Sequence, residues 1–159
     1  MSTVQFNLKK WYQFLALGFG SGLAKKAPGT FGTLAAVPLV ALLLWLGNSY
    51  LLGFVLTGAV LGVYLCGKTA ADIGEHDHKA IVWDEIIGYG ISLLWLPLHW
   101  QTLLLGFVLF RLFDIVKPWP ISVLDKHVHG GLGIMLDDIA AGIATLAVLH
   151  LLLPYLPLN

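Results

Sequence analysis

The stretch IIGYGISLLWLPLHWQTLLLGFVLF, residues 86–110, decides how this chain folds. It contains no charged residue, and as one helix it would be about 37 Å long, enough to cross a membrane. Asp84 and Glu85, which precede it, would then lie on the opposite membrane face from Arg111. The alternative is a pair of short helices joined by a turn at residues 97–101, where a proline, a polar His-Gln pair and an interfacial tryptophan occur. We expect this hairpin, which brings the charges at both ends together.

The composition of the whole chain indicates a membrane protein. Of its 159 residues, 58% are hydrophobic and only 11% are charged, whereas ordinary soluble domains carry about 25% charged residues. A net charge of zero and the lack of a basic stripe argue against nucleic acid as a partner. The single cysteine, Cys66, rules out an intramolecular disulfide. We expect one domain over residues 1–159.

The uncharged runs predict an all-α integral membrane bundle of short hydrophobic helices. Each predicted segment is near or below the length that crosses a hydrocarbon core of about 30 Å, so flanking residues must contribute. The five segments expected from the sequence are residues 33–47, 50–67, 86–97, 102–113 and 139–153.

With the hairpin, all basic residues fall on one membrane face. The positive-inside rule makes that face cytoplasmic. The five segments predict a multi-pass protein. The nine residues concerned are Lys9, Lys10, Lys25, Lys26, Lys68, Lys79, Arg111, Lys117 and Lys126.

Three charges crowd the end of the fourth segment in FRLFDIVKPWP, residues 110–120. Arg111, Asp114 and Lys117 share one helical stripe, because positions three apart lie on nearly the same face. Pro118 lacks a backbone donor and disfavours helical geometry at the residue before it, so we expect the helix to end there. Ionisable groups near a hydrophobic helix end are costly and usually partnered. An Arg111–Asp114 ion pair is the simplest explanation.

Carboxylates also gather on the expected cytoplasmic face, at Asp84/Glu85, Asp114 and Asp137/Asp138. Either adjacent pair alone is explained by helix capping and the helix dipole. Together they form an oxygen-rich set of the kind that suits Mg²⁺, which keeps waters for a phosphate. Basic side chains beside them suit phosphate binding, a guanidinium by its planar fork and an ammonium as a point charge. The sequence therefore predicts a metal and phosphate site at the membrane surface.

The glycine-rich stretch GFGSGLAKKAPGTFG, residues 18–32, has two explanations. Its glycines could let backbone amides approach an anion, or could let membrane helices pack closely. It lacks the Walker ending and the Rossmann spacing. His76 and His78 form a His-x-His pattern, which is weak evidence for zinc. No role follows from the sequence for these two or for His127 and His129.

Four motifs together resemble the phosphatidylglycerophosphatase A family of bacterial inner-membrane lipid phosphatases. They are GFGSGL…APGTFG, HDHKAIVWDEIIG, FRLFDIVKPWPI and HVHGGLGIMLDDIAAG, which occur in the family's order across residues 18–142. The adjacent pair Lys25-Lys26 departs from the pattern, so no catalytic role is assigned to it.

The resemblance implies hydrolysis of the terminal phosphate of the membrane lipid phosphatidylglycerophosphate to phosphatidylglycerol, with Mg²⁺ required. It also implies a helical fold in the bacterial inner membrane, where the positive-inside rule puts the active site on the cytoplasmic side. By motif, the metal ligands would be Asp84, Glu85, Asp114 and Asp138, and these four with Asp137 would be the catalytic carboxylates. By the same match, the phosphate would be held by Arg111, Lys117, Thr30 and Gly29.

Other phosphatase chemistries do not fit the sequence. Cys-x₅-Arg and Asp-x-Asp patterns are absent, and one arginine is too few for a vanadium-type lipid phosphatase. Metal-assisted attack by water remains, and the sequence leaves open the general base, a covalent phosphoenzyme step and the oligomeric state. Two other classes of membrane protein are alternatives to a phosphatase. One is a transporter, whose carboxylates would typically lie at the membrane midplane, and the other is a non-catalytic subunit that uses the charges for ion binding or ion pairing.

Overall fold

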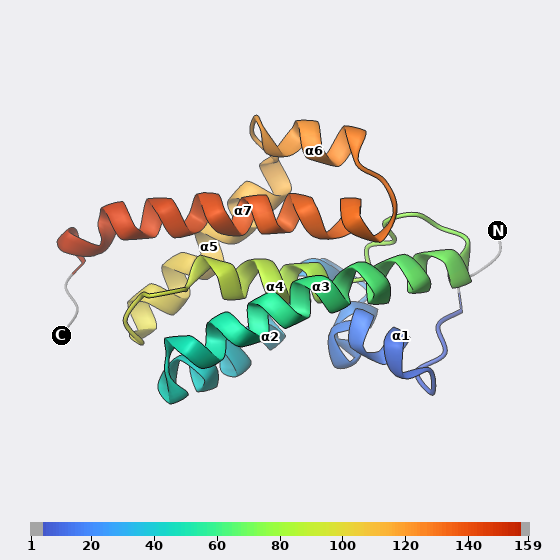
Figure 1. Ribbon diagram of the computed structural model, residues 1–159, viewed down its shortest axis with the longest axis horizontal. Coiled ribbons are helices and arrows are strands. Elements are labelled where there is room, and N and C mark those ends of the chain that lie inside the picture. The colour runs from blue at the N-terminus through green and yellow to red at the C-terminus, as the bar shows by residue number, and fades with distance from the viewer. Residues whose placement is uncertain (1–4, 157–159) are drawn as a thin grey trace.

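A computed structural model of the protein describes residues 5–156 (Figure 1). Every regular element in that range is a helix, as the sequence predicts. In chain order they are α1 (Trp11–Ala16), η1 (Gly18–Leu23), α2 (Pro28–Leu46), α3 (Asn48–Ile73), α4 (Trp83–Ser92), α5 (Trp100–Val116), α6 (Ile121–His127), α7 (Gly130–Leu152) and η2 (Leu153–Tyr155).

Residues 86–110 form a hairpin, which confirms the prediction from Pro97 and its neighbours. The helix α4 ends at Ser92, and α5 begins only at Trp100. Between them the chain reverses, and the backbone N–H of Trp95 donates a hydrogen bond to Oδ1 of Asn48 at 2.6 Å. The α4–α5 turn therefore lies beside the α2–α3 turn, at one end of the bundle (Figure 1).

Within residues 5–156, three helices are long and apolar enough to cross a membrane, namely α2, α3 and the run Gly130–Tyr155 that contains α7. The helix α4 has 10 residues, which gives it a length of about 15 Å, half of a hydrocarbon core. The protein is thus an all-helical membrane protein in which one short helix does not span by itself.

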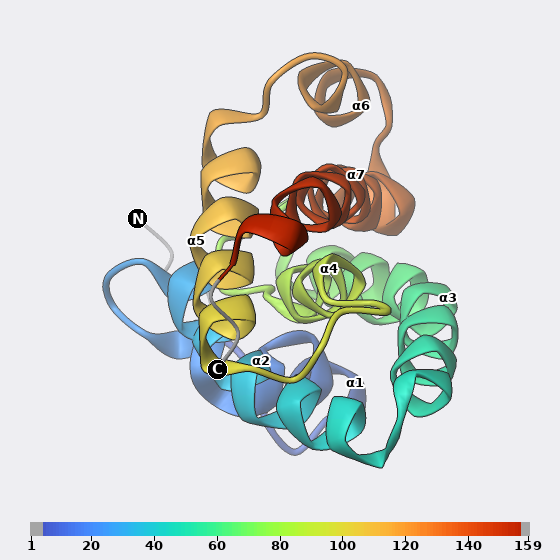
Figure 2. The ribbon, with the colours of Figure 1, turned by 90° about the vertical axis from the view of Figure 1, so that its left-hand side faces the viewer.

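The short helix α4 is the centre of the bundle, enclosed by α2, α3, α5 and α7 (Figure 2). Nine of its residues are buried, because its neighbours replace lipid on every side. Small residues let the helices approach: a Cβ on Gly142 of α7 would lie 2.4 Å from the carbonyl oxygen of Gly88 in α4. The indole N–H of Trp83 donates to the carbonyl of Gly58 in α3 at 2.9 Å. Glycines and one indole thus fix where α4 sits.

Several helices extend beyond their hydrophobic segments. The last one begins at Gly130 and not near Ile139, and α3 runs on to Ile73. The capping explanation is therefore wrong for Asp137 and Asp138, which lie inside α7. The hydrophobic segments end where charged residues begin. The helices continue beyond that point because their backbone groups hydrogen-bond within the helix and the charged side chains face a polar interior.

Candidate active site

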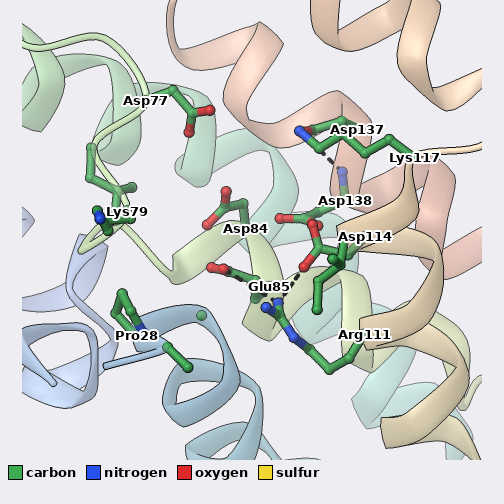
Figure 3. A pocket seen from close by; sticks show the side chains of 14 residues that line it. Pro28, Asp77, Lys79, Asp84, Glu85, Arg111, Asp114, Lys117, Asp137 and Asp138 are labelled. Carbon is green, nitrogen blue, oxygen red and sulfur yellow. Dashed lines mark hydrogen bonds and ion pairs between the residues drawn. The ribbon is translucent and has the colours of Figure 1, made fainter. Parts of the chain in front are cut away.

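A cavity of about 360 Å³ lies where four helices and one loop meet (Figure 3). The walls combine the first turn of α2, the loop before α4, the start of α4, the end of α5 and the second and third turns of α7. The lining residues are Ala27, Pro28, Gly29, Asp77, Lys79, Ile81, Asp84, Glu85, Arg111, Asp114, Ile115, Lys117, Asp137 and Asp138.

The packing of α7 against α4 brings Asp138 to Asp84 and Glu85, on the one face where the sequence predicts these acids. One carboxylate oxygen of each lies within 4.8 Å of the other two (Figure 3). Asp84 and Asp138 are only 6% and 3% exposed. Each of the three also has a buried oxygen for which residues 5–156 provide no hydrogen-bond partner, namely Oδ1, Oε2 and Oδ1. A divalent cation would satisfy these oxygens.

The environment of this carboxylate trio, Asp84, Glu85 and Asp138, disfavours three bare negative charges. Burial, followed by the charge of Glu85, raises the pKa of Asp84 well above its ordinary value. Burial and the charge of Asp138 do the same to the pKa of Glu85. Desolvation and like charges both penalise an ionised carboxyl group. Hard oxygen donors in this number are what Mg²⁺ accepts, so the trio fits that ion.

Arg111 and Asp114 form the ion pair expected from their spacing in α5. Asp114 lines the same cavity and lies beside Asp138 (Figure 3), although it is not one of the three carboxylates within 4.8 Å of one another. The guanidinium of Arg111 also lies 3.6 Å from Oε1 of Glu85, and its buried Nε–H has no partner within the described range. The ion pair and the site are therefore not alternatives: the pair is one wall of the cavity and leaves a donor unused.

Lys117 ends α5 in the left-handed conformation, with φ of +45°, directly before Pro118. From there its ammonium binds Asp125 at 2.6 Å and Asp137 at 2.5 Å. Burial alone would lower the pKa of Lys117, but these two hydrogen bonds outweigh it and raise the pKa above the ordinary value. Asp137 is thus engaged by Lys117 and does not join the trio.

Gly29 is part of the cavity wall, whereas Thr30 is not among the lining residues. A Cβ at Gly29 would lie 2.2 Å from Oε1 of Glu85 and 3.0 Å from Arg111. The glycine-rich stretch therefore serves close packing: Gly22 and Gly32 similarly abut the chain at residues 80–82. The structure does not bring the expected phosphate ligand Thr30 to the site.

The protein family follows from comparison with known sequences. The sequence model of one family, described as Phosphatidylglycerophosphatase A, matches residues 14–153. The chain belongs to this family. The matched range contains all four motifs and every residue of the cavity.

Curated relatives agree with membership of the phosphatidylglycerophosphatase A family. The chain is 49% identical to "Phosphatidylglycerophosphatase A" of Escherichia coli strain K12, over 93% of this chain and 87% of that protein. It is 52% identical to the Haemophilus influenzae protein of the same name, over 84% of this chain and 83% of that protein. A Bacteroides thetaiotaomicron protein with the provisional name phosphatidylinositol-3-phosphatase is 34% identical, over 81% and 85% respectively. No solved structure matches the chain.

Three charged residues in or beside the cavity were not expected from the sequence of this phosphatidylglycerophosphatase A family member. Asp77 and Lys79 line the cavity from the loop before α4, and Asp125 in α6 holds Lys117. The only signal for Lys79 was its place in the motif HDHKAIVWDEIIG, four residues before Trp83. Nothing in the sequence distinguished Asp125, because its partner lies across a proline-rich turn.

The histidines that the sequence left open have backbone contacts. His76 accepts a hydrogen bond from the backbone N–H of Gly130 at 2.7 Å, which joins the loop before α4 to the start of α7. His78 accepts one from Ala80 at 3.1 Å, and His127 contacts the carbonyl of Val123 in its own helix. His129 precedes α7 with its ring 5.8 Å from that of His76. His76 and His78 therefore hold the loop before α4, and none of the four histidines lines the cavity that contains the trio.

Proposed function

We propose that the protein removes the terminal phosphate of phosphatidylglycerophosphate by hydrolysis, which gives phosphatidylglycerol and inorganic phosphate. One observation carries the proposal: three buried carboxylates with unpartnered oxygens share a cavity with Arg111 and Lys117. Such a set provides donors for a cation and donors for a phosphate at the same place. The name phosphatidylglycerophosphatase A, which the two closely similar relatives share, supplies the lipid.

The trio is proposed to hold Mg²⁺. Its fit rests on the oxygen donors within 4.8 Å of one another and on their burial. When bound, the ion would neutralise charge on the phosphoryl oxygens and acidify a water molecule. Asp114, which the sequence suggested as a fourth ligand, is instead proposed to orient Arg111 through their ion pair.

The phosphate is proposed to bind between Arg111 and Lys117. Arg111 offers its unpartnered Nε–H. Lys117 has three N–H donors, of which Asp125 and Asp137 use two, so one is left for a phosphate oxygen. Asp137 therefore positions Lys117 and does not contact the reacting atoms.

The reaction adds water across one phosphorus–oxygen bond. A bond forms between the water oxygen and phosphorus, and the bond from phosphorus to the glycerol oxygen breaks. A carboxylate of the cavity takes the proton of the water, and the leaving glycerol oxygen takes up a proton. The three carboxylates lie within reach of one another, which suits both tasks.

We place the site on the cytoplasmic side of the bacterial inner membrane. The cavity is lined by the start of α2, the start of α4 and the end of α5, whereas the α2–α3 and α4–α5 turns lie at the other ends of these helices. Arg111, Lys117 and Lys79 line the cavity, and the positive-inside rule assigns such an end to the cytoplasm.

Phosphate release by the purified protein tests the proposal. In detergent micelles containing phosphatidylglycerophosphate, we expect release that needs Mg²⁺ and stops with a chelator. Phosphatidylinositol 3-phosphate in equal amount serves as a second substrate, because one relative bears that provisional name. Faster release from the inositol lipid would reassign the substrate. No release from either lipid, in folded protein with Mg²⁺, would favour a transporter or a non-catalytic subunit.

A further inference from the structure

Lys79 differs from the other basic residues of the cavity in having no ion-pair partner within residues 5–156. Arg111 is paired with Asp114, and Lys117 with Asp125 and Asp137. Lys79 is exposed and lies across the cavity from Lys117, on the loop before α4 (Figure 3). An exposed ammonium at the rim, with no internal partner, is available to an anionic ligand.

The turn that carries Lys79 is fixed in place. The backbone N–H of Ala80 donates to Nδ1 of His78 at 3.1 Å, and that of Ile81 donates to the carbonyl of His78 at 2.8 Å. The turn also packs against η1 so closely that a Cβ on Gly22 would lie 2.1 Å from the carbonyl oxygen of Ala80. The backbone of Lys79 is therefore held at the rim of the cavity.

A second hollow of about 230 Å³ adjoins the cavity and shares Pro28 and Lys79 with it. Lys25 lies in its wall, so two ammonium groups border it, and none of its lining residues is acidic. The main cavity differs sharply, since six of its lining residues are carboxylates against three basic residues. A singly charged anion is therefore attracted to the smaller hollow and needs a cation to enter the larger cavity.

The substrate of the proposed function carries two phosphates, a terminal monoester and a diester, joined by one glycerol. Two adjoining hollows of different charge match these two groups. We propose that Lys79, assisted by Lys25, binds the phosphodiester while the monoester occupies the carboxylate cavity. This assignment rests on the proposed function and gives Lys79 the task of selecting lipids that carry a second phosphate.

Steady-state kinetics of the Lys79→Gln variant, with each reaction product added as an inhibitor, test this assignment. Inorganic phosphate reports on the monoester site alone, and short-chain phosphatidylglycerol reports on the diester site. One charge-assisted hydrogen bond corresponds to about a tenfold change in affinity. We expect the KM for phosphatidylglycerophosphate and the inhibition constant of phosphatidylglycerol each to rise about tenfold, with kcat within about twofold of its original value. The inhibition constant of inorganic phosphate should not change.

Two further variants control for charge and structure. Lys79→Arg should keep the original constants, and Lys126→Gln, which removes an exposed charge outside both hollows, should behave like the original protein. Equal rises in both inhibition constants, or no rise in either, would overturn the role of Lys79. If the unaltered protein releases phosphate and Lys79→Gln matches it, only this inference fails. If the unaltered protein releases none, the proposed function fails and the inference with it.

Discussion

At the scale of single residues, the site depends on which carboxylate faces which partner. Asp137 and Asp138 are neighbours in α7, yet Asp138 faces Asp84 and Glu85 while Asp137 binds Lys117. Adjacent residues on a helix point about 100° apart, so one pair of acids can serve two different purposes. Asp114 is paired with Arg111 while it lines the same cavity beside Asp138.

We predict that Asp84→Asn and Asp138→Asn each lower Mg²⁺-dependent phosphate release by about a hundredfold or more, because a lost ligand removes several kcal/mol of charge stabilisation. Both variants should still fold, since asparagine keeps the size of the side chain. Initial rates and Mg²⁺ binding by calorimetry measure the effect.

Glu75→Gln is the matched control for these two variants. Glu75 is exposed and lies outside the cavity, and within residues 5–156 its carboxylate has one ion-pair partner, His78 at 3.9 Å. Asp125 would be a poor control, because it binds Lys117. Near-normal rates and Mg²⁺ affinity in the two Asn variants would show that the trio is structural.

At the scale of elements, the spacing of α4 and α7 assembles the trio. Two of its acids lie at the start of α4 and the third lies in α7. The helices are held close by Gly88 and Gly142, where a Cβ would meet the carbonyls of the opposite helix at 2.7 and 2.4 Å. Small residues at such crossings permit close approach in membrane proteins.

We predict that Gly142→Val disrupts the site although no site residue is altered. The added methyl groups must move α7 away from α4, and overpacking of this kind costs about 1–3 kcal/mol. Mg²⁺ affinity and the rate of phosphate release should both fall, and the melting temperature should decrease.

Gly53→Val provides the comparison, because a Cβ at Gly53 meets nothing within 4 Å. This variant should retain both Mg²⁺ affinity and rate. If Gly142→Val matched it in all three measurements, the α4–α7 spacing would not determine the geometry of the trio.

At the scale of the whole molecule, the charged end and the two turns lie at opposite ends of the bundle. The cavity is lined by the start of α2, the loop before α4, the start of α4, the end of α5 and part of α7. The opposite end holds the α2–α3 and α4–α5 turns, joined by the Trp95–Asn48 hydrogen bond. A lipid headgroup and the charged end can therefore meet at one membrane surface.

We predict that cysteines placed at Ser49 and Leu98 react with a membrane-impermeant thiol reagent in intact cells, whereas one at Lys26 reacts only after permeabilisation. All three positions are exposed. The background should be Cys66→Ala, since the native thiol is buried and lies outside the cavity. The background itself should retain phosphate release. Labelling of Lys26→Cys in intact cells would reverse the orientation, and labelling of Leu98→Cys only after permeabilisation would contradict the shared end of the two turns.

The sequence by itself determined the helical class, the hairpin within residues 86–110 and the end of α5 before Pro118. These follow from local physics: apolar runs form helices in a membrane, and proline limits the residue before it. The motifs also determined the family and most acids of the cavity.

Only the tertiary structure decided which acids form the trio, that Lys117 is held by Asp125 and Asp137, and that Thr30 is not among the residues lining the cavity. It also decided that α7 begins at Gly130 and that Lys79 lies at the rim. The reason is that these features depend on distances between residues far apart in the chain. Such distances are set by how closely glycines let α4 approach its neighbours, and no local pattern of hydropathy or charge records them.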